Sequence, residues 1–394
     1  MVKAVGRSGG ASRSGRVTLQ DVADAAGVSL VTASRAFRQS DLVAQATRAA
    51  VQAAVARLGY IPDLVAGSLA ARASHQVAIV VPSLATPAFM STIRGATEVL
   101  QAHGYQTVLG DANLSRETEA ALIATFLGRR VDAIILADVA QSPEAQDLLR
   151  RSLVPVVETW TLSVEPIDMN VGFDNCAAAR EMTQHLIATG RRHVGMICGP
   201  LRQNLRGRQR RLGYFEAIEE GGLPADLFIE LPYPIRFADA GEALEALVVR
   251  CPQLDAVFCS GDSFAVGALL AAQRRGWAVP DRLAVAGLGD LDLAAHLVPA
   301  LSTAVVPGER MGRLAGEMIV ARLSGREVAR KVVDVGFEIV VRGSTDPRRP
   351  CHDPGAEPAA KVARAGSARP AGAKPTRSHP ATASPSHRAA RKPA

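Results

Sequence analysis

Short apolar runs alternate with helix-like segments in two successive series, and this pattern limits the possible fold more than any other feature of the chain. The first series is residues 76–81, 106–109, 133–136 and 154–157, and the second is residues 193–198, 227–230, 256–259 and 283–286. Buried strands of parallel sheets read as continuous apolar runs, and strands that alternate with helices build such sheets. Residues 130–135 (RVDAII) and 253–258 (QLDAVF) repeat one pattern, each after a helix and at the opening of a strand. The sequence therefore predicts two similar α/β subdomains with parallel sheets.

Two such sheets that face each other form a ligand cleft from the carboxyl ends of their strands. The candidates for this site are side chains that follow the predicted strands: Ser83, Phe89, Glu158, Trp160, Asp174, Arg210, Asp262 and Asp290. Two of them have an alternative interpretation. Arg210 is one of several arginines between residues 206 and 211, any of which can be a solvated surface residue. Asp262 can instead cap the helix that follows it.

The N-terminal stretch 17–37 (VTLQDVADAAGVSLVTASRAF) has the composition of two short helices separated by a glycine. Thr18 and Asp21 have the spacing of a capping box, which predicts a first helix over residues 19–26. Gly27 supplies the backbone freedom that a tight turn needs. The pattern is typical of a helix-turn-helix that reads a DNA groove, and an ordinary amphipathic helical hairpin is the alternative.

The segment after the turn completes a small three-helix unit. Ser29 is placed to cap the second helix. A third helix is predicted over residues 45–58, with Gly59 as its terminating residue. The sequence thus predicts a DNA-binding headpiece over residues 17–62, ahead of the two α/β subdomains.

At this point the chain resembles the lac repressor family of bacterial transcription regulators. The shared motifs are Thr-Leu-x-Asp-Val-Ala at the start of the headpiece, Gly-Val-Ser at the turn, a Ser-Arg pair, and Gly-Tyr-Ile-Pro after the third helix. The match is ungapped across the headpiece, and its order continues to about Thr345. The resemblance implies a periplasmic-binding-protein-like sensor over residues 76–345, in which the chain crosses between subdomains near residues 175, 304 and 335.

The resemblance also implies roles for individual headpiece residues. Residues after the turn read bases in the major groove, and a hinge helix over residues 63–71, within a linker that runs to residue 75, orders on the operator and inserts a leucine into the minor groove. The implied DNA-binding residues are Thr18, Leu19, Ser29, Leu30, Val31, Thr32, Ser34, Arg35, Tyr60, Leu69 and Ala70. Leu30 and Val31 are apolar, which leaves Arg35 as the side chain of this helix that can grip a guanine. The chain departs from the family at Ala44, where a serine cap is usual, and at Asp63-Leu64, which replaces the commoner Asn-Arg.

In the sensor, the resemblance places at Arg210 an arginine that grips the hydroxyls or the carboxylate of the ligand. Gly261 and the pair Leu288-Gly289 replace residues that hydrogen-bond neutral sugars in the family. Five runs match the gluconate-responsive branch, namely residues 80–84, 103–107, 171–175, 255–259 and 309–313. The resemblance therefore implies an acyclic sugar acid, gluconate or a relative, as effector, with another sugar or a sugar phosphate as the alternative.

Charge is concentrated at the two ends of the chain. Residues 1–75 carry a formal charge of +5 and residues 346–394 carry +7, which leaves −5 for residues 76–345 because the whole chain carries +7. Residues 1–16 and 346–394 have few large apolar side chains, and we expect both segments to be disordered. The basic tail is either a solvated appendage or an auxiliary DNA-binding arm.

Other classes of protein find little support in the sequence. We expect a cytoplasmic protein without a membrane segment, because no apolar run could span a bilayer and the first ten residues are polar. The five cysteines lack metal-type spacing, and no P-loop, Gly-x-Gly-x-x-Gly after the first strand, or Ser-His-Asp set indicates an enzyme or a cofactor. A transport-type binding protein shares the cleft but lacks a headpiece. The sequence predicts a repressor that binds double-stranded operator DNA as a homodimer, with a tetramer left open, and that a small-molecule effector releases.

Overall fold

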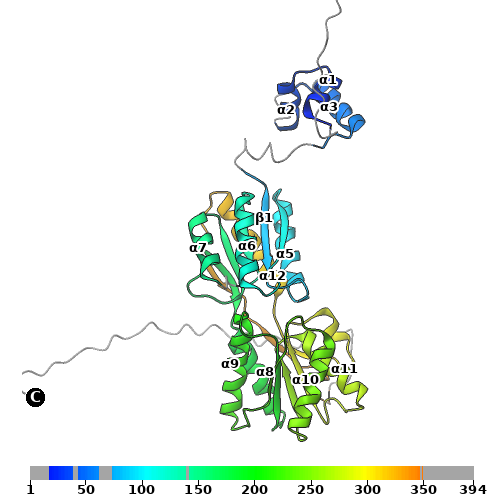
Figure 1. Ribbon diagram of the computed structural model, residues 1–394, viewed down its shortest axis with the longest axis vertical. Helices are drawn as coiled ribbons and strands as arrows, with labels where there is room; N and C mark the ends of the chain where they lie inside the picture. Colours follow the sequence, from blue (N-terminus) through cyan, green and yellow to red (C-terminus); the bar gives the residue numbers. More distant parts are fainter. Residues whose placement is uncertain (1–16, 39–42, 62–72, 139–141, 347, 349–394) are drawn as a thin grey trace, which may run out of the picture. The chain divides into compact units, whose positions relative to one another are not determined.

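A computed structural model describes residues 17–38, 43–61, 73–138, 142–346 and 348 (Figure 1). These residues form a three-helix headpiece and a two-lobed α/β domain, which are described separately below. The predicted hinge residues Leu69 and Ala70 and the two charged ends, residues 1–16 and 349–394, lie outside the described ranges.

The headpiece consists of α1 (Leu19–Ala26), α2 (Leu30–Arg38) and α3 (Gln45–Leu58). Its helix ends follow from local hydrogen bonds, and the capping prediction is confirmed. The Asp21 amide donates to Thr18 Oγ1 over 3.3 Å, and the Thr18 amide donates to Asp21 Oδ2 over 2.8 Å. Gly27 has φ 67° and ends α1, whereas Ala44 gives α3 no side-chain cap. The buried side chains of the three-helix core include Val22, Ala33, Val51 and Ala54.

Lobe 1 is built on a six-stranded parallel sheet in the order β11-β5-β4-β3-β1-β2. Its strands are β1 (Gln76–Val81), β2 (Gln106–Asp111), β3 (Ala133–Leu136), β4 (Val156–Thr161), β5 (Met169–Phe173) and β11 (Val332–Asp334). Helices α5 (Phe89–Ala102) and α12 (Gly308–Leu323) cover one face, and α6 (Arg116–Gly128) and α7 (Pro143–Ser152) cover the other. Alternate residues of β1 serve the two faces, since Ile79 packs with α5 and Val80 with α6.

Lobe 2 repeats this plan with the sheet order β12-β10-β9-β8-β6-β7. Its strands are β6 (Val194–Cys198), β7 (Phe228–Glu230), β8 (Ala256–Cys259), β9 (Ala284–Leu288), β10 (Ser302–Val305) and β12 (Glu338–Val340), of which only β12 is antiparallel to its neighbour. Helices α8 (Asn175–Ala188) and α9 (Leu205–Glu220) pack on one face, and α10 (Phe237–Arg250) and α11 (Asp262–Arg274) pack on the other. The prediction of two sheets built mainly of parallel strands is confirmed, whereas β5, β10, β11 and β12 were not predicted.

The chain passes between the lobes three times, after β5, after β10 and between β11 and β12. Each lobe is consequently assembled from segments that are far apart in the sequence. In lobe 1, α5 and α12 cross so closely that a Cβ atom on Gly312 would lie 2.0 Å from the Thr92 carbonyl oxygen. Within the described ranges, no helix is long and apolar enough to cross a membrane.

Candidate effector cavity and DNA-reading helix

A cavity of about 370 Å³ lies between the two lobes, at the carboxyl ends of their strands. Lobe 1 contributes the segment after β1, from Pro82 to Ala88, together with Leu114 and Trp160. Lobe 2 contributes the start of α9, the loop before α10 and the residues that follow β8 and β9. The predicted residues Ser83, Trp160, Arg210 and Asp262 are all part of this lining. A cleft between facing parallel sheets is where the topology places a ligand.

Arg210 is the most strongly constrained charged group of the cavity. Its Nε donates to Asn175 Oδ1 over 2.8 Å and its Nη1 to the Ser260 carbonyl oxygen over 2.6 Å. Nη2 is buried and has no hydrogen-bond partner among the described residues. Burial, followed by the nearby charge of Arg206, lowers the pKa of Arg210 to about 9. The guanidinium therefore carries a charge at neutral pH and keeps one donor unused, as a site for an anion requires.

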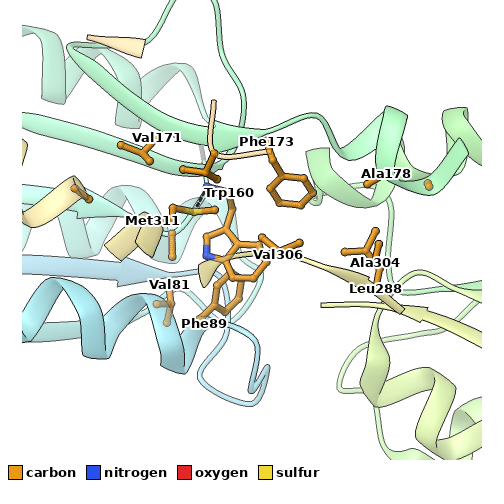
Figure 2. Packing of buried hydrophobic residues seen from close by; sticks show 14 of the residues in the cluster. Val81, Phe89, Trp160, Val171, Phe173, Ala178, Leu288, Ala304, Val306 and Met311 are labelled. Carbon is orange, nitrogen blue, oxygen red and sulfur yellow. Dashed lines mark hydrogen bonds between the residues drawn. The ribbon is translucent and has the colours of Figure 1, made fainter. Parts of the chain in front are cut away.

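Trp160 forms the wall of the cavity on the side of lobe 1. It is 1% exposed and packs edge-to-face on Phe89, with ring centroids 5.3 Å apart. Its φ of 70° is unusual for a bulky residue. The strained backbone is held on both sides, because its amide donates to Met311 Sδ and its carbonyl oxygen accepts from Asn175 Nδ2. Figure 2 shows the indole among the side chains of Phe89 and Met311.

Asp262 is the first residue of α11, and its buried carboxylate joins three segments of lobe 2. Oδ1 accepts from Thr303 Oγ1 over 2.7 Å, and Oδ2 accepts from the Leu291 amide over 2.9 Å. Burial raises its pKa to about 6. The N-cap position itself belongs to Gly261, so the side chain of Asp262 ties β10 and the loop after β9 to α11.

Four predicted effector residues lie outside the cavity lining, for different reasons. Phe89 packs behind Trp160. Glu158 lies in the middle of β4, which extends to Thr161, and accepts from the Ile167 amide. Asp174 is exposed and caps α8. Asp290 forms an ion pair with Arg342, with Nη2 and Oδ1 2.9 Å apart. The prediction that these four contact the ligand receives no support from the cavity.

Several lining residues were not predicted from the sequence, among them Arg206 and Tyr233. The sequence places Arg206 among several arginines that can be solvated, whereas its side chain is 9% exposed and its Nε donates to Asp138 Oδ2 over 2.9 Å. It lies four residues before Arg210 on α9 and so on the same helix face, a spacing that could have revealed it. Tyr233 comes from the loop before α10, where the sequence has no periodic pattern. Within the described ranges, no cluster of side chains could hold a metal ion.

The start of α2 presents an exposed and partly apolar surface. Leu30 and Val31 are 44% and 59% exposed, and Arg35 is exposed as well. The helix is initiated by Ser29, whose Oγ accepts from the Thr32 amide over 3.1 Å. The other predicted DNA-binding residues in the described headpiece, Thr18, Leu19, Thr32, Ser34 and Tyr60, are partly buried. Exposed apolar residues at the start of the second helix suit contact with base edges in a major groove.

A two-lobed α/β domain with a ligand cavity, joined in one chain to a helix-turn-helix, defines a ligand-responsive DNA-binding regulator. Residues 18–63 match the model of the bacterial regulatory proteins of the lacI family, and residues 183–345 match a periplasmic binding protein-like domain. The chain belongs to the lacI family. It is a transcriptional regulator, and regulators of this family bind operator DNA and small-molecule effectors and are generally dimeric.

Several relatives match almost over their full length. The HTH-type transcriptional regulator GntR of Escherichia coli K12 is 35% identical over 330 residues, which cover 84% of this chain and 98% of the relative. The GntR regulator of Pseudomonas aeruginosa is 37% identical over 334 residues, covering 84% and 96%. The crystal structure of a LacI-family regulator from Silicibacter pomeroyi superposes with a TM-score of 0.78 at 30% identity, covering 84% of this chain and 99% of that one.

Proposed function

We propose that this regulator is a repressor of sugar-acid catabolism genes and that a gluconate-type acid, bound in the interlobe cavity, releases it from its operator. The observation that carries the proposal is the unpartnered, buried Nη2 of Arg210 in the cavity lining. A carboxylate at this point gains a charge-assisted hydrogen bond from Arg210, and the guanidinium needs no further desolvation because it is already buried. The similarity to regulators named GntR supports the same class of effector.

The rest of the lining favours an anion over a neutral sugar. The lining contains three arginines and one carboxylate, Asp262. Arg206 and Arg236 are paired with Asp138 and Asp239, so Arg210 is the lining arginine that keeps an unused donor. Gly261 and Gly289 contribute no side-chain hydrogen bonds to the cavity, and a Cβ atom at Gly261 would find its nearest neighbour, Phe264, at 3.7 Å. Steric crowding therefore does not account for glycine at position 261. The cavity thus has fewer side chains that could hydrogen-bond to hydroxyl groups but keeps the guanidinium of Arg210. This combination suits a charged ligand better than a neutral sugar ring.

The mechanism that we infer is thermodynamic linkage between the cavity and the DNA-binding parts. An effector that contacts both lobes favours one lobe arrangement, and it weakens operator binding only by its differential affinity for the two arrangements, commonly about 1–3 kcal/mol. In a homodimer, two headpieces read the halves of a pseudo-palindromic operator. In each, Leu30, Val31 and Arg35 contact bases, while Leu69 of the hinge enters the minor groove.

An operator titration tests the proposal. The protein is titrated against DNA from upstream of its own gene, with gluconate, glucuronate, 6-phosphogluconate or neutral glucitol, and the bound fraction is scored by gel retardation. We expect gluconate to release the DNA and glucitol, which has the same chain but no carboxylate, to leave it bound. Release by glucitol alone would refute the acid effector, and release by the phosphate ester alone would favour the sugar-phosphate alternative.

A further inference from the structure

Several polar contacts cross from one lobe to the other beside the cavity. Arg116 Nη2 donates to the Arg202 carbonyl oxygen and Asn175 Nδ2 to the Trp160 carbonyl oxygen, and two further contacts join side chains of both lobes. The first is the ion pair of Asp138, which follows β3 in lobe 1, with Arg206 of α9 in lobe 2. The second centres on Tyr233 of lobe 2, whose hydroxyl donates to Asn113 Oδ1 over 2.8 Å and lies 3.1 Å from Ser83 Oγ in lobe 1. We call the five side chains of these two further contacts the clasp.

The Asp138–Arg206 ion pair connects the two lobes through side chains that are held in place on both sides. Asp138 Oδ1 accepts from Thr161 Oγ1 over 2.7 Å, which fixes the carboxylate to lobe 1, while Oδ2 accepts from Arg206. The guanidinium carbon of Arg206 lies 4.6 Å from the ring centroid of Phe89 and 5.7 Å from that of Trp160, so its planar head also covers lobe 1 aromatics. Both charged side chains are less than a tenth exposed. A buried ion pair of this kind is costly to break, because separation leaves each charge without its partner.

Tyr233 adds a weaker contact at the edge of the same cavity. Its ring is part of the lining, and its hydroxyl reaches the two lobe 1 segments that follow β1 and β2. Tyr233 is only partly buried, so its hydrogen bonds stabilise closure less than the ion pair does. In lobe 2 the two contacts come from α9 and from the loop before α10, and in lobe 1 they come from different strand ends. They therefore restrain the lobes at two separate points.

We propose that the clasp holds the lobes closed over the cavity through the chain's own side chains, so that a ligand enters and leaves only when the clasp opens. The proposal rests on the proposed function only in taking the cavity as the ligand site. It assigns Asp138 and Tyr233 a gating role distinct from ligand contact: they set how often the cavity opens. Because the ligand enters only after the clasp opens, the clasp limits the association rate constant of the ligand.

Fluorescence quenching tests the clasp without any ligand. The chain has two tryptophans, and Trp277→Phe leaves Trp160, which is 1% exposed and covered by Arg206 from the other lobe. In this background, we expect Asp138→Asn to raise the acrylamide quenching constant of Trp160 on the order of tenfold and Tyr233→Phe about threefold, as for the loss of one charge-assisted and one neutral hydrogen bond. Asp168→Asn, which removes a lobe 1 carboxylate that pairs with Arg322 and Lys331, is the matched control and should leave quenching unchanged.

Stopped-flow mixing with gluconate then tests the gating role. The association rate constant for gluconate should rise about tenfold in Asp138→Asn and about threefold in Tyr233→Phe, because the ligand enters only when the clasp is open. A faster dissociation with an unchanged association rate would show that the residue contacts the ligand and does not gate it.

The outcomes separate the clasp from the proposed function. If the wild type does not bind gluconate, the proposed effector is wrong, but the quenching comparison still decides the clasp. Unchanged quenching in both single variants, with wild-type circular dichroism, would overturn it. Tyr233→Phe removes one hydroxyl from a partly buried side chain. Its quenching constant therefore tests the clasp even if Asp138→Asn fails to fold.

Discussion

Replacement of Arg210 separates its role in the fold from its role toward the effector. The guanidinium holds the Asn175 side chain and the Ser260 carbonyl oxygen within lobe 2. Arg210→Ala would leave both acceptors buried without their donor, at about 1–3 kcal/mol each. It should therefore lower the free energy of unfolding as well as abolish release by gluconate. Arg210→Lys keeps a cation at this position and is the more informative variant.

The expected loss of gluconate affinity follows from Arg210 Nη2, the donor of this guanidinium that the fold leaves unused. A lysine ammonium has no planar fork and cannot serve Asn175, Ser260 and a carboxylate with the same geometry. The loss of a charge-assisted hydrogen bond of about 1.5–3 kcal/mol corresponds to a dissociation constant for gluconate about 10-fold to 150-fold higher. Operator affinity without effector should remain unchanged, because no headpiece residue is altered.

Calorimetric titration of gluconate into the wild type, Arg210→Lys and Arg208→Ala measures these differences. Arg208 lies on the same helix but is exposed, and it donates to the carbonyl oxygens of Leu201 and Arg202. Its variant therefore controls for a general loss of positive charge. Equal gluconate affinity in the wild type and in Arg210→Lys would refute the carboxylate site. So would a wild type that binds glucitol but no acid.

Three further predictions concern other parts of the chain. Burial raises the pKa of Asp262 from 3.8 to about 6, so its protonated form favours the fold. In urea denaturation, the free energy of unfolding of the wild type minus that of Asp262→Asn should therefore fall as pH rises from 4 through 6. A difference that does not change with pH would contradict this assignment. Leu69→Ala should weaken operator binding by about 1–3 kcal/mol in gel retardation and leave gluconate affinity unchanged. Unchanged operator affinity would mean that this leucine does not insert into the minor groove. Truncation after Thr345 removes a charge of +7. The slope of log K against log salt concentration for random DNA should then become shallower by about 0.9 per lost phosphate contact, and the response to the effector should not change. An unchanged slope would show that the tail is a solvated appendage.

Features with local causes could be predicted from the sequence. The first helix begins at Leu19 because Thr18 and Asp21 satisfy each other's backbone amides over three residues. Strands 76–81, 133–136 and 256–259 were predicted to the residue, since a strand buried on both faces must be apolar throughout. Strand β4 was predicted over residues 154–157 but spans Val156–Thr161. The predicted strand ends too early because Thr159 and Thr161 interrupt the apolar run, although both are buried.

The site depended more on tertiary contacts and was predicted only in part. Thr159 and Thr161 are satisfied across the sheet by the Leu136 carbonyl oxygen and by Asp138, partners that a linear pattern does not reveal. With β4 ended early, Glu158 looked like a strand-end residue. Arg206 looked solvated because its partner, Asp138, is 68 residues away in the other lobe. Residues whose environment comes from the opposite lobe are those that the sequence could not resolve.

The two short strands β11 and β12 also determine when the protein can become complete during synthesis. They come from residues 332–340, and they pair with β5 in one sheet and β10 in the other. Until they leave the ribosome, β5 and β10 are edge strands that lack the partners they have in the finished sheets, and another chain can pair there. The headpiece, in contrast, needs nothing beyond residue 61 for its three helices. A nascent chain therefore has its complete DNA-reading unit long before either lobe can close on a ligand, and premature termination yields a headpiece without a working sensor.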